Sequence, residues 1–300
     1  MSEKRFLART APGMPTTDGA GVKLTRMVGT PYLDMVDPFL MLDRMDSDDP
    51  DSYIAGFPNH PHRGFETVTL ILEGLMRHKD SVGNEGVLGP GDVQWMTAGR
   101  GIIHSEIPEM VEGRLKGFQL WVNLPSHLKM TAPTYQDIPA QEVPVVEGPG
   151  SSVRVITGSH EGHDGPAKAH TPIRVLDVRL DAGSTWTTTP ADGNGLFMCV
   201  YEGSITALDN LGREQEIEAP KSGIFHGDGP VEVTAGADGA EILYCEGAPI
   251  NEPVARYGPF VMNTNQELEQ AVRDYNAGLL ATYIEVSDFP ARCARRSGRV

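Results

Sequence analysis

Two pairs of residues have the types and spacing of metal ligands. His60 and His62 form an H-x-H pair, and His104 and Glu106 form an H-x-E pair further along the chain. Residues i and i+2 of a β-strand lie on the same face, so each pair would project two ligand groups to one side. Two such strands facing each other would bring three imidazoles and one carboxylate to one point. The spacing therefore predicts a metal site.

Two alternatives to this set stay open at the level of the sequence. A lone H-x-H pair is more often a pair of surface histidines than a pair of metal ligands. The second pair, H-x-E, in a strand that starts near Gly101, is what favours a metal site. Glu66 is a second candidate for the carboxylate and for a catalytic role, because it stands on an even step from His62. Its alternative role is a hydrogen bond within a barrel wall. We rank Glu106 first because it shares a strand with His104.

The ligand types narrow the chemistry. Imidazole and carboxylate together suit Fe, Mn, Ni, Cu or Zn, and such sets with open positions are associated with non-haem iron oxygen chemistry. Three histidines and one glutamate leave an octahedral ion unsaturated, which disfavours a purely structural ion. Ligand type alone does not select the metal.

Strands are the elements that must position these residues. Short apolar runs rich in Val, Ile, Thr and Leu recur from about residue 22 to 122, with Gly or Pro in every gap, which predicts an antiparallel β domain. Residues 133–150 hold four prolines and read as a connector, after which a second strand-rich block follows. We predict domains at 1–135 and 151–300, a linker at 136–150, and one helix at about 265–280 that starts from Asn265 and stops near Gly278.

Composition excludes several classes of protein. The 300 residues include 25 Lys+Arg against 41 Asp+Glu, a net charge of −16, which disfavours direct contact with nucleic acid. No apolar run is long enough to cross a membrane, and no secretory signal is visible. The 3 cysteines are far apart, so neither a disulfide framework nor a CxxC metal site is available, and we expect a cytoplasmic protein.

Several other polar or aromatic residues are candidates for a supporting role. Gln119 and Trp121 alternate on the predicted strand GFQLWVN, and His78 and Asp80 share one face of another strand. They would line a pocket or orient the ligands, since a ligating imidazole needs a partner for its other nitrogen. Core packing is the alternative for each. His226 is an isolated histidine beside a turn, and we expect no metal in the second block.

Longer motifs resemble the pirin family, a branch of the cupin superfamily. They are DPFLMLD (37–43), HPHRGFETVTLILEG (60–74), HKDSVGNEGVLGPGDVQWMTAGRGIIHSE (78–106), GFQLWVNLP (117–125) and EPVARYGPFVMNT (252–264). The resemblance implies an all-β chain of two tandem cupin barrels, of which the first holds one iron ion, Fe(II), on His60, His62, His104 and Glu106. Other divalent transition metals are alternatives.

The same resemblance implies a function. It points to a metal-dependent dioxygenase of the quercetin 2,3-dioxygenase type, which opens the ring of a flavonol or related enediol with O₂ and releases carbon monoxide. The alternative is an iron-binding, redox-sensitive regulatory protein that acts on a transcription factor or a metabolic enzyme through protein contact. In the first case the partners are a small aromatic substrate and O₂. In neither case do we expect direct binding to nucleic acid or membrane.

Overall fold

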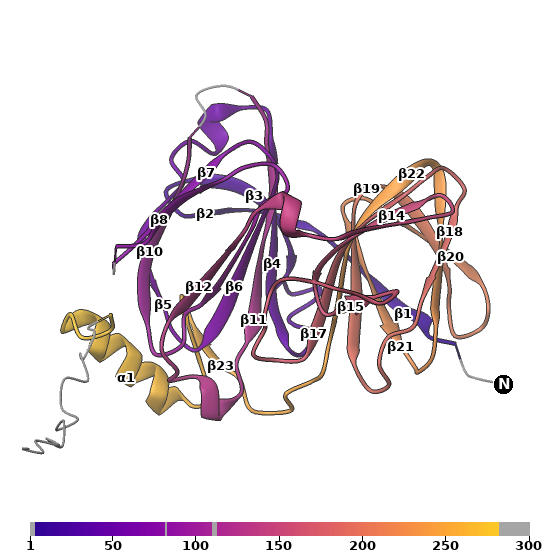
Figure 1. The fold of residues 1–300 in the computed structure, drawn as a ribbon. Helices are drawn as coiled ribbons and strands as arrows, with labels where there is room; N and C mark the ends of the chain where they lie inside the picture. Colours follow the sequence, from indigo (N-terminus) through magenta and orange to yellow (C-terminus); the bar gives the residue numbers. More distant parts are fainter. Residues whose placement is uncertain (1–3, 82, 110–112, 282–300) are drawn as a thin grey trace, which may run out of the picture.

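The chain is built almost entirely from antiparallel β-strands (Figure 1). The computed structural model describes residues 4–81, 83–109 and 113–281. The strands gather into two β-barrels that lie side by side, with one helix at the outer edge of the first barrel. The prediction of an all-β chain with a short C-terminal helix is confirmed.

The first barrel combines two sheets. The seven-stranded sheet has the order β12 (Thr134–Ile138), β9 (Val93–Thr97), β6 (Phe65–Glu73), β11 (Leu115–Asn123), β4 (Phe39–Ser47), β3 (Val22–Val28) and β2 (Met14–Asp18). The four-stranded sheet has the order β5 (Phe57–His62), β10 (Ile102–Pro108), β7 (Met76–Asp80) and β8 (Glu85–Leu88). The two strands that carry the histidine pairs, β5 and β10, are therefore neighbours.

The second barrel is formed by one nine-stranded sheet. Its order is β1 (Phe6–Pro12), β21 (Lys221–His226), β19 (Gly195–Leu208), β22 (Val231–Gly247), β17 (Ile173–Leu180), β14 (Ser151–Thr157) and β13 (Val145–Gly148), with β18 (Thr185–Thr188) on β22 and β20 (Glu214–Glu218) on β19. The remaining elements are the pairs β15 (Ser159–His160) with β16 (His163–Asp164) and β23 (Ala255–Tyr257) with β24 (Phe260–Met262), the 3₁₀ turns η1 (Pro50–Ser52), η2 (Ser126–Leu128) and η3 (Ala140–Glu142), and the helix α1 (Asn265–Asn276).

The seven-stranded sheet is buried on both faces because the second barrel packs against it. On β6, Val68 and Leu70 belong to the same apolar core as Phe197 of the second barrel. The alternate residue Thr69 faces the interior of the first barrel, where it contacts the side chain of Gln119. Side chains along β6 and β11 therefore alternate between the interior of the first barrel and the interface with the second barrel.

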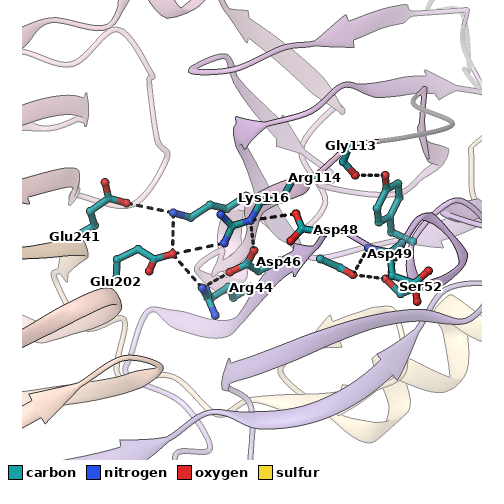
Figure 2. A network of polar contacts seen from close by, with 12 residues as sticks. Arg44, Asp46, Asp48, Asp49, Ser52, Gly113, Arg114, Lys116, Glu202 and Glu241 are labelled. Atoms are coloured by element: carbon teal, nitrogen blue, oxygen red, sulfur yellow. Dashed lines mark hydrogen bonds and ion pairs between the residues drawn. The ribbon is translucent and has the colours of Figure 1, made fainter.

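Ion pairs at the rim of the interface add to the apolar contact between the barrels (Figure 2). Glu202 of the second barrel accepts from Lys116 at 3.0 Å, and Glu241 lies 3.2 Å from the same ammonium. Arg44 and Arg114 also approach Glu202, at 3.6 and 3.7 Å. These charges form a network in which one side chain takes part in several ion pairs. Ordering such a side chain costs less conformational entropy per ion pair than ordering the side chains of isolated pairs.

Both ends of the chain cross to the opposite barrel. Strand β1 pairs with β21 of the second barrel, while β23, β24 and α1 lie against the first barrel (Figure 1). The predicted linker, residues 136–150, contains the end of β12, the turn η3 and strand β13. Residues 136–150 thus hold strands of both barrels, and β1 belongs to the sheet of the second barrel. The division into domains at 1–135 and 151–300 stays a prediction.

The N-cap of helix α1 lies one residue earlier than the sequence predicted. Thr264, not Asn265, is the N-cap, and it forms a capping box in which Glu267 N–H donates to the Thr264 hydroxyl at 3.3 Å while Thr264 N–H donates to the Glu267 carboxylate at 2.8 Å. The helix ends at Asn276, and Gly278 follows with φ of +72°. The predicted stop at Gly278 agrees with this end.

Candidate metal centre

Three histidine side chains converge where β5 meets β10. His60 pairs directly with His104 across the ladder, and His62 pairs with Ile102. The ligand nitrogens of His60, His62 and His104 all lie within 4.8 Å of one another. The i, i+2 spacing on each strand and the antiparallel register together produce this arrangement.

The three imidazoles are suited to bind a cation. Burial, together with the neighbouring imidazoles, lowers the pKa of His62 and of His104 well below the ordinary histidine value. Both side chains are therefore neutral near pH 7, the form that ligates metals. Both ring nitrogens of His104 are buried without a hydrogen-bond partner among the residues that the structure describes. A buried polar atom without a partner costs free energy, and a metal ion bound to one of these nitrogens would give it a partner. The three imidazoles therefore fit a metal ion.

Glu106 lies beside the imidazoles and is held by hydrogen bonds. The Gln119 amide donates to its two carboxylate oxygens at 3.2 and 2.9 Å, and the Thr69 hydroxyl lies 3.0 Å from one of them. A register shift between His104 and Glu106 sets Glu106 opposite Phe57 of β5. The extra residue of this shift lies on β5, since β10 stays in regular register with β7, and Glu106 therefore keeps the same face of β10 as His104. Its carboxylate is not one of the ligand atoms that lie within 4.8 Å of one another, and its role as fourth ligand stays a prediction.

A cavity of about 640 Å³ opens at these residues. Its size is in the range that holds a small organic ligand. Gln119 and Trp121 both line it, as predicted from their alternation on β11. The other lining residues are Asp18, Gly19, Ala20, Leu24, Arg26, Met41, Asp43, Met45, Phe57, Pro58, Asn59, His60, His62, Glu106, Arg256, Gly258 and Pro259.

Glu66 faces away from this cavity. Its carboxylate accepts from the Thr97 hydroxyl and contacts the His170 ring nitrogen, both at 2.8 Å. Glu66 does not share a face with His62, although the two are four residues apart, because they are not on one continuous strand. Strand β5 ends at His62 and β6 begins only at Phe65, with Gly64 between them at φ of +91°. This break resets which face each residue occupies, so Glu66 lies on the interface side of β6, with Val68.

The remaining candidates do not line the cavity, although His78 and Asp80 of β7 pair with Glu106 and His104 of β10. His78 is buried and its ring contacts the amide of Gln94. Asp80 accepts from the backbone N–H and the side-chain amide of Asn84 at 2.8 and 2.6 Å, and so closes a turn. His226 is exposed at the end of β21. None of these side chains lines the cavity at the metal centre.

Three charged residues of the cavity were not anticipated from the sequence. Arg26 and Asp43 form a two-pronged ion pair with both distances 2.8 Å. Charged residues in the otherwise apolar strands β3 and β4 are a signal that could have indicated them. Arg256 comes from β23, close to the C-terminal end of the chain, and no local pattern connects it to the histidines.

The fold and the site together define the class of protein. Two β-barrels side by side, of which the first carries a three-histidine cluster next to a cavity, make a bicupin with a candidate metal centre. Residues 21–122 match the Pirin family and residues 175–281 match the Pirin C-terminal cupin domain. The chain therefore belongs to the pirin family.

Known relatives match over nearly the full chain. A Pseudomonas aeruginosa protein that is provisionally named a quercetin 2,3-dioxygenase is 47% identical, over 94% of this chain and 100% of its own. A pirin-like protein of Caulobacter vibrioides is also 47% identical, over 91% of this chain and 98% of its own. A crystal structure of quercetin 2,3-dioxygenase from Acinetobacter baumannii has a TM-score of 0.85 and 34% identity, and the match covers 93% of this chain and 99% of that one.

Within the described residues, no helix has the length and apolar character that crossing a membrane would require.

Proposed function

We propose that this protein is an iron-dependent dioxygenase that opens the ring of a flavonol or a related enediol with O₂ and releases carbon monoxide. The observation that carries the proposal is the convergence of His60, His62 and His104 at a cavity of about 640 Å³. The names and similarity of the relatives support the reaction type.

The proposed ligands are the three imidazoles and the Glu106 carboxylate. Ferrous iron bound there would supply Lewis acidity toward a substrate hydroxyl and redox capacity toward O₂. Iron is our choice among the divalent metals that such ligands accept. The neutral state of His62 and His104 means that neither must lose a proton before it binds the ion.

Glu106 is the proposed proton acceptor. In this role a carboxylate oxygen of Glu106 takes the proton of the substrate hydroxyl, while the Gln119 amide and the Thr69 hydroxyl hold the group in one orientation. Glu66 was the other carboxylate considered. Its hydrogen bonds to Thr97 and His170, on the interface side of β6, lead us to assign the role to Glu106.

The apolar part of the wall would bind the aromatic rings. Trp121, Phe57 and Met41 line the cavity, and Trp121 is itself fixed by packing on Phe65, with ring centroids 4.3 Å apart. A flat apolar surface of this kind binds a flavonol-sized ring system and displaces water from it.

A single assay tests the function. Protein loaded with Fe(II) without oxygen is mixed with quercetin and then with O₂, and bleaching of the flavonol absorbance and release of carbon monoxide are followed. We expect both signals from the wild-type protein and neither from His104→Ala. Undiminished turnover by His104→Ala would contradict the proposal. Iron binding with no turnover of any flavonol would favour an iron-holding regulatory protein that acts on a protein partner.

We also propose that the protein works in the cytoplasm. Cys199 and Cys245 are buried and unpaired, which suits a reducing compartment. Attachment of a fluorescent protein and microscopy of live cells would test the location.

A further inference from the structure

Arg256 places a positive charge in the wall of the cavity without an ion-pair partner. Its guanidinium donates to the Leu40 carbonyl at 3.2 Å and contacts the Met41 sulfur at 3.5 Å. It forms no ion pair with any residue that the structure describes. The other arginine of the cavity, Arg26, is satisfied by two carboxylates, Asp43 at 2.8 Å and Asp18 at 2.9 Å.

Trp121 connects this charge to the metal centre. The Arg256 guanidinium carbon lies 5.3 Å from the Trp121 ring centre, and the His62 ring lies 5.2 Å from the same tryptophan. One indole therefore separates the guanidinium from a proposed metal ligand. An aromatic molecule that places an oxygen at the histidines and lies along Trp121 would reach Arg256 with its far end.

The charges of the wall favour an anion once a cation is bound. Two arginines and three acidic residues line the cavity: Arg26, Arg256, Asp18, Asp43 and Glu106. A divalent cation at the histidines reverses the sign of this balance. Burial and the charge of Arg26 lower the pKa of Arg256, and the charges of Asp34 and Asp43, which form no ion pair with it in the described part of the chain, act in the opposite direction. Among the described residues the Arg256 guanidinium donates to the Leu40 carbonyl and the Met41 sulfur, and a guanidinium has five N–H donors, so it retains the capacity to bind an acidic group.

We propose that Arg256 is an anion subsite, and that the preferred substrates carry a carboxylate or another acidic group at the end remote from the metal. This inference rests on the proposed function, because it assumes a substrate that chelates the metal at His60, His62 and His104. It goes further by defining the substrate class as anionic aromatic chelators and not neutral flavonols alone.

Binding of a matched pair of ligands tests the subsite. 3-Hydroxyflavone and its 4′-carboxylate are titrated calorimetrically into the Fe(II)-loaded protein with oxygen excluded. We expect the carboxylate to bind about tenfold tighter to the wild-type protein, the effect of one charge-assisted hydrogen-bonded pair. Arg256→Gln should remove this preference and leave the affinity for 3-hydroxyflavone within about twofold of wild type. Arg256→Lys should keep part of it.

Controls separate the subsite from a structural effect and from the reaction. Arg179→Gln, an exposed arginine of the second barrel, should keep the wild-type preference. The metal content of Arg256→Gln should match wild type, since Arg256 contacts none of the proposed metal ligands. Equal affinity of the wild-type protein for both flavones, or an equal loss for both in Arg256→Gln, would overturn the inference. A preference without turnover under O₂ would uphold the subsite while the dioxygenase proposal fails.

Discussion

At the scale of single residues, His104 shows how the fold prepares a ligand. Its ring is buried and its nitrogens have no hydrogen-bond partner among the described residues, which costs free energy in the metal-free protein. The pairs H-x-H and H-x-E were enough to predict the convergence of His60, His62 and His104, because strand periodicity is local. The pairs were not enough to predict the orientation of the Glu106 carboxylate, which depends on hydrogen bonds from β6 and β11.

Substitution of His104 should abolish metal binding. We expect His104→Ala to lower the affinity for Fe(II) at least about 100-fold, since loss of a ligand costs no less than loss of a group that orients one. Metal analysis after dialysis measures this. His226→Ala, at an exposed histidine of the second barrel, is the matched control and should bind as wild type does. Equal metal content in the two variants would exclude His104 as a ligand.

Gln119 should affect the reaction even when the metal is fully loaded. Gln119→Leu removes the amide that donates to both Glu106 oxygens. We expect kcat with quercetin to fall about 10- to 100-fold in protein saturated with Fe(II). The pH profile of kcat should also change, because Gln119 positions the proposed proton acceptor. A variant with an unchanged kcat would show that Gln119 does not position Glu106.

At the scale of elements, the short gap between β5 and β6 decides the arrangement of the site. Gly64 has φ of +91°, and a Cβ at this position would lie 1.9 Å from the Val261 carbonyl oxygen. Gly64 thus lets the chain turn and lets β24 approach closely. The sequence predicted both strands, but the exchange of faces at Gly64, and with it the position of Glu66, depends on the approach of a segment from the other end of the chain.

Gly64→Ala should destabilise the protein more than the same substitution at a glycine that is constrained only by its backbone angle. We expect a loss of more than about 2 kcal/mol in the free energy of unfolding, from backbone strain plus the displacement of β24. Gly21→Ala is the matched control, because Gly21 also has a positive φ, +115°, but open space around it, and should lose about 1 kcal/mol. Urea denaturation measures both. Equal losses would show that the contact with Val261 is unimportant.

At the scale of the whole molecule, the crossing of the two chain ends was beyond sequence reasoning. Strand β1 completes the second barrel and the C-terminal segment completes the first, and both pairings join residues more than two hundred positions apart. Lys129 joins the C-terminal segment to the first barrel, since its ammonium donates to the Gly64 carbonyl at 2.8 Å and to the Val261 carbonyl at 3.0 Å. Arg63 does the same through its ion pair to Asp274 at 2.7 Å. These contacts bring Arg256 to the cavity.

Lys129 should make stability depend on pH. Burial lowers its pKa from 10.5 to about 8. Between these values the unfolded chain binds more protons than the folded protein, so the contribution of Lys129 to stability rises with pH. The free energy of unfolding of wild type minus that of Lys129→Met should grow by about 3 kcal/mol from pH 8 to 10.5. Chemical denaturation at several pH values measures it, and other titrating groups cancel in the difference. A difference that is independent of pH would contradict the shifted pKa.

The central claim is that one metal ion is held by His60, His62 and His104 in the first barrel. Anomalous diffraction at the iron absorption edge, from crystals of the Fe(II)-loaded protein, tests it most directly. We predict one iron peak per chain, at bonding distance from a nitrogen of each of the three imidazoles. A protein without such a peak after loading, or with iron only at another place, would contradict the account.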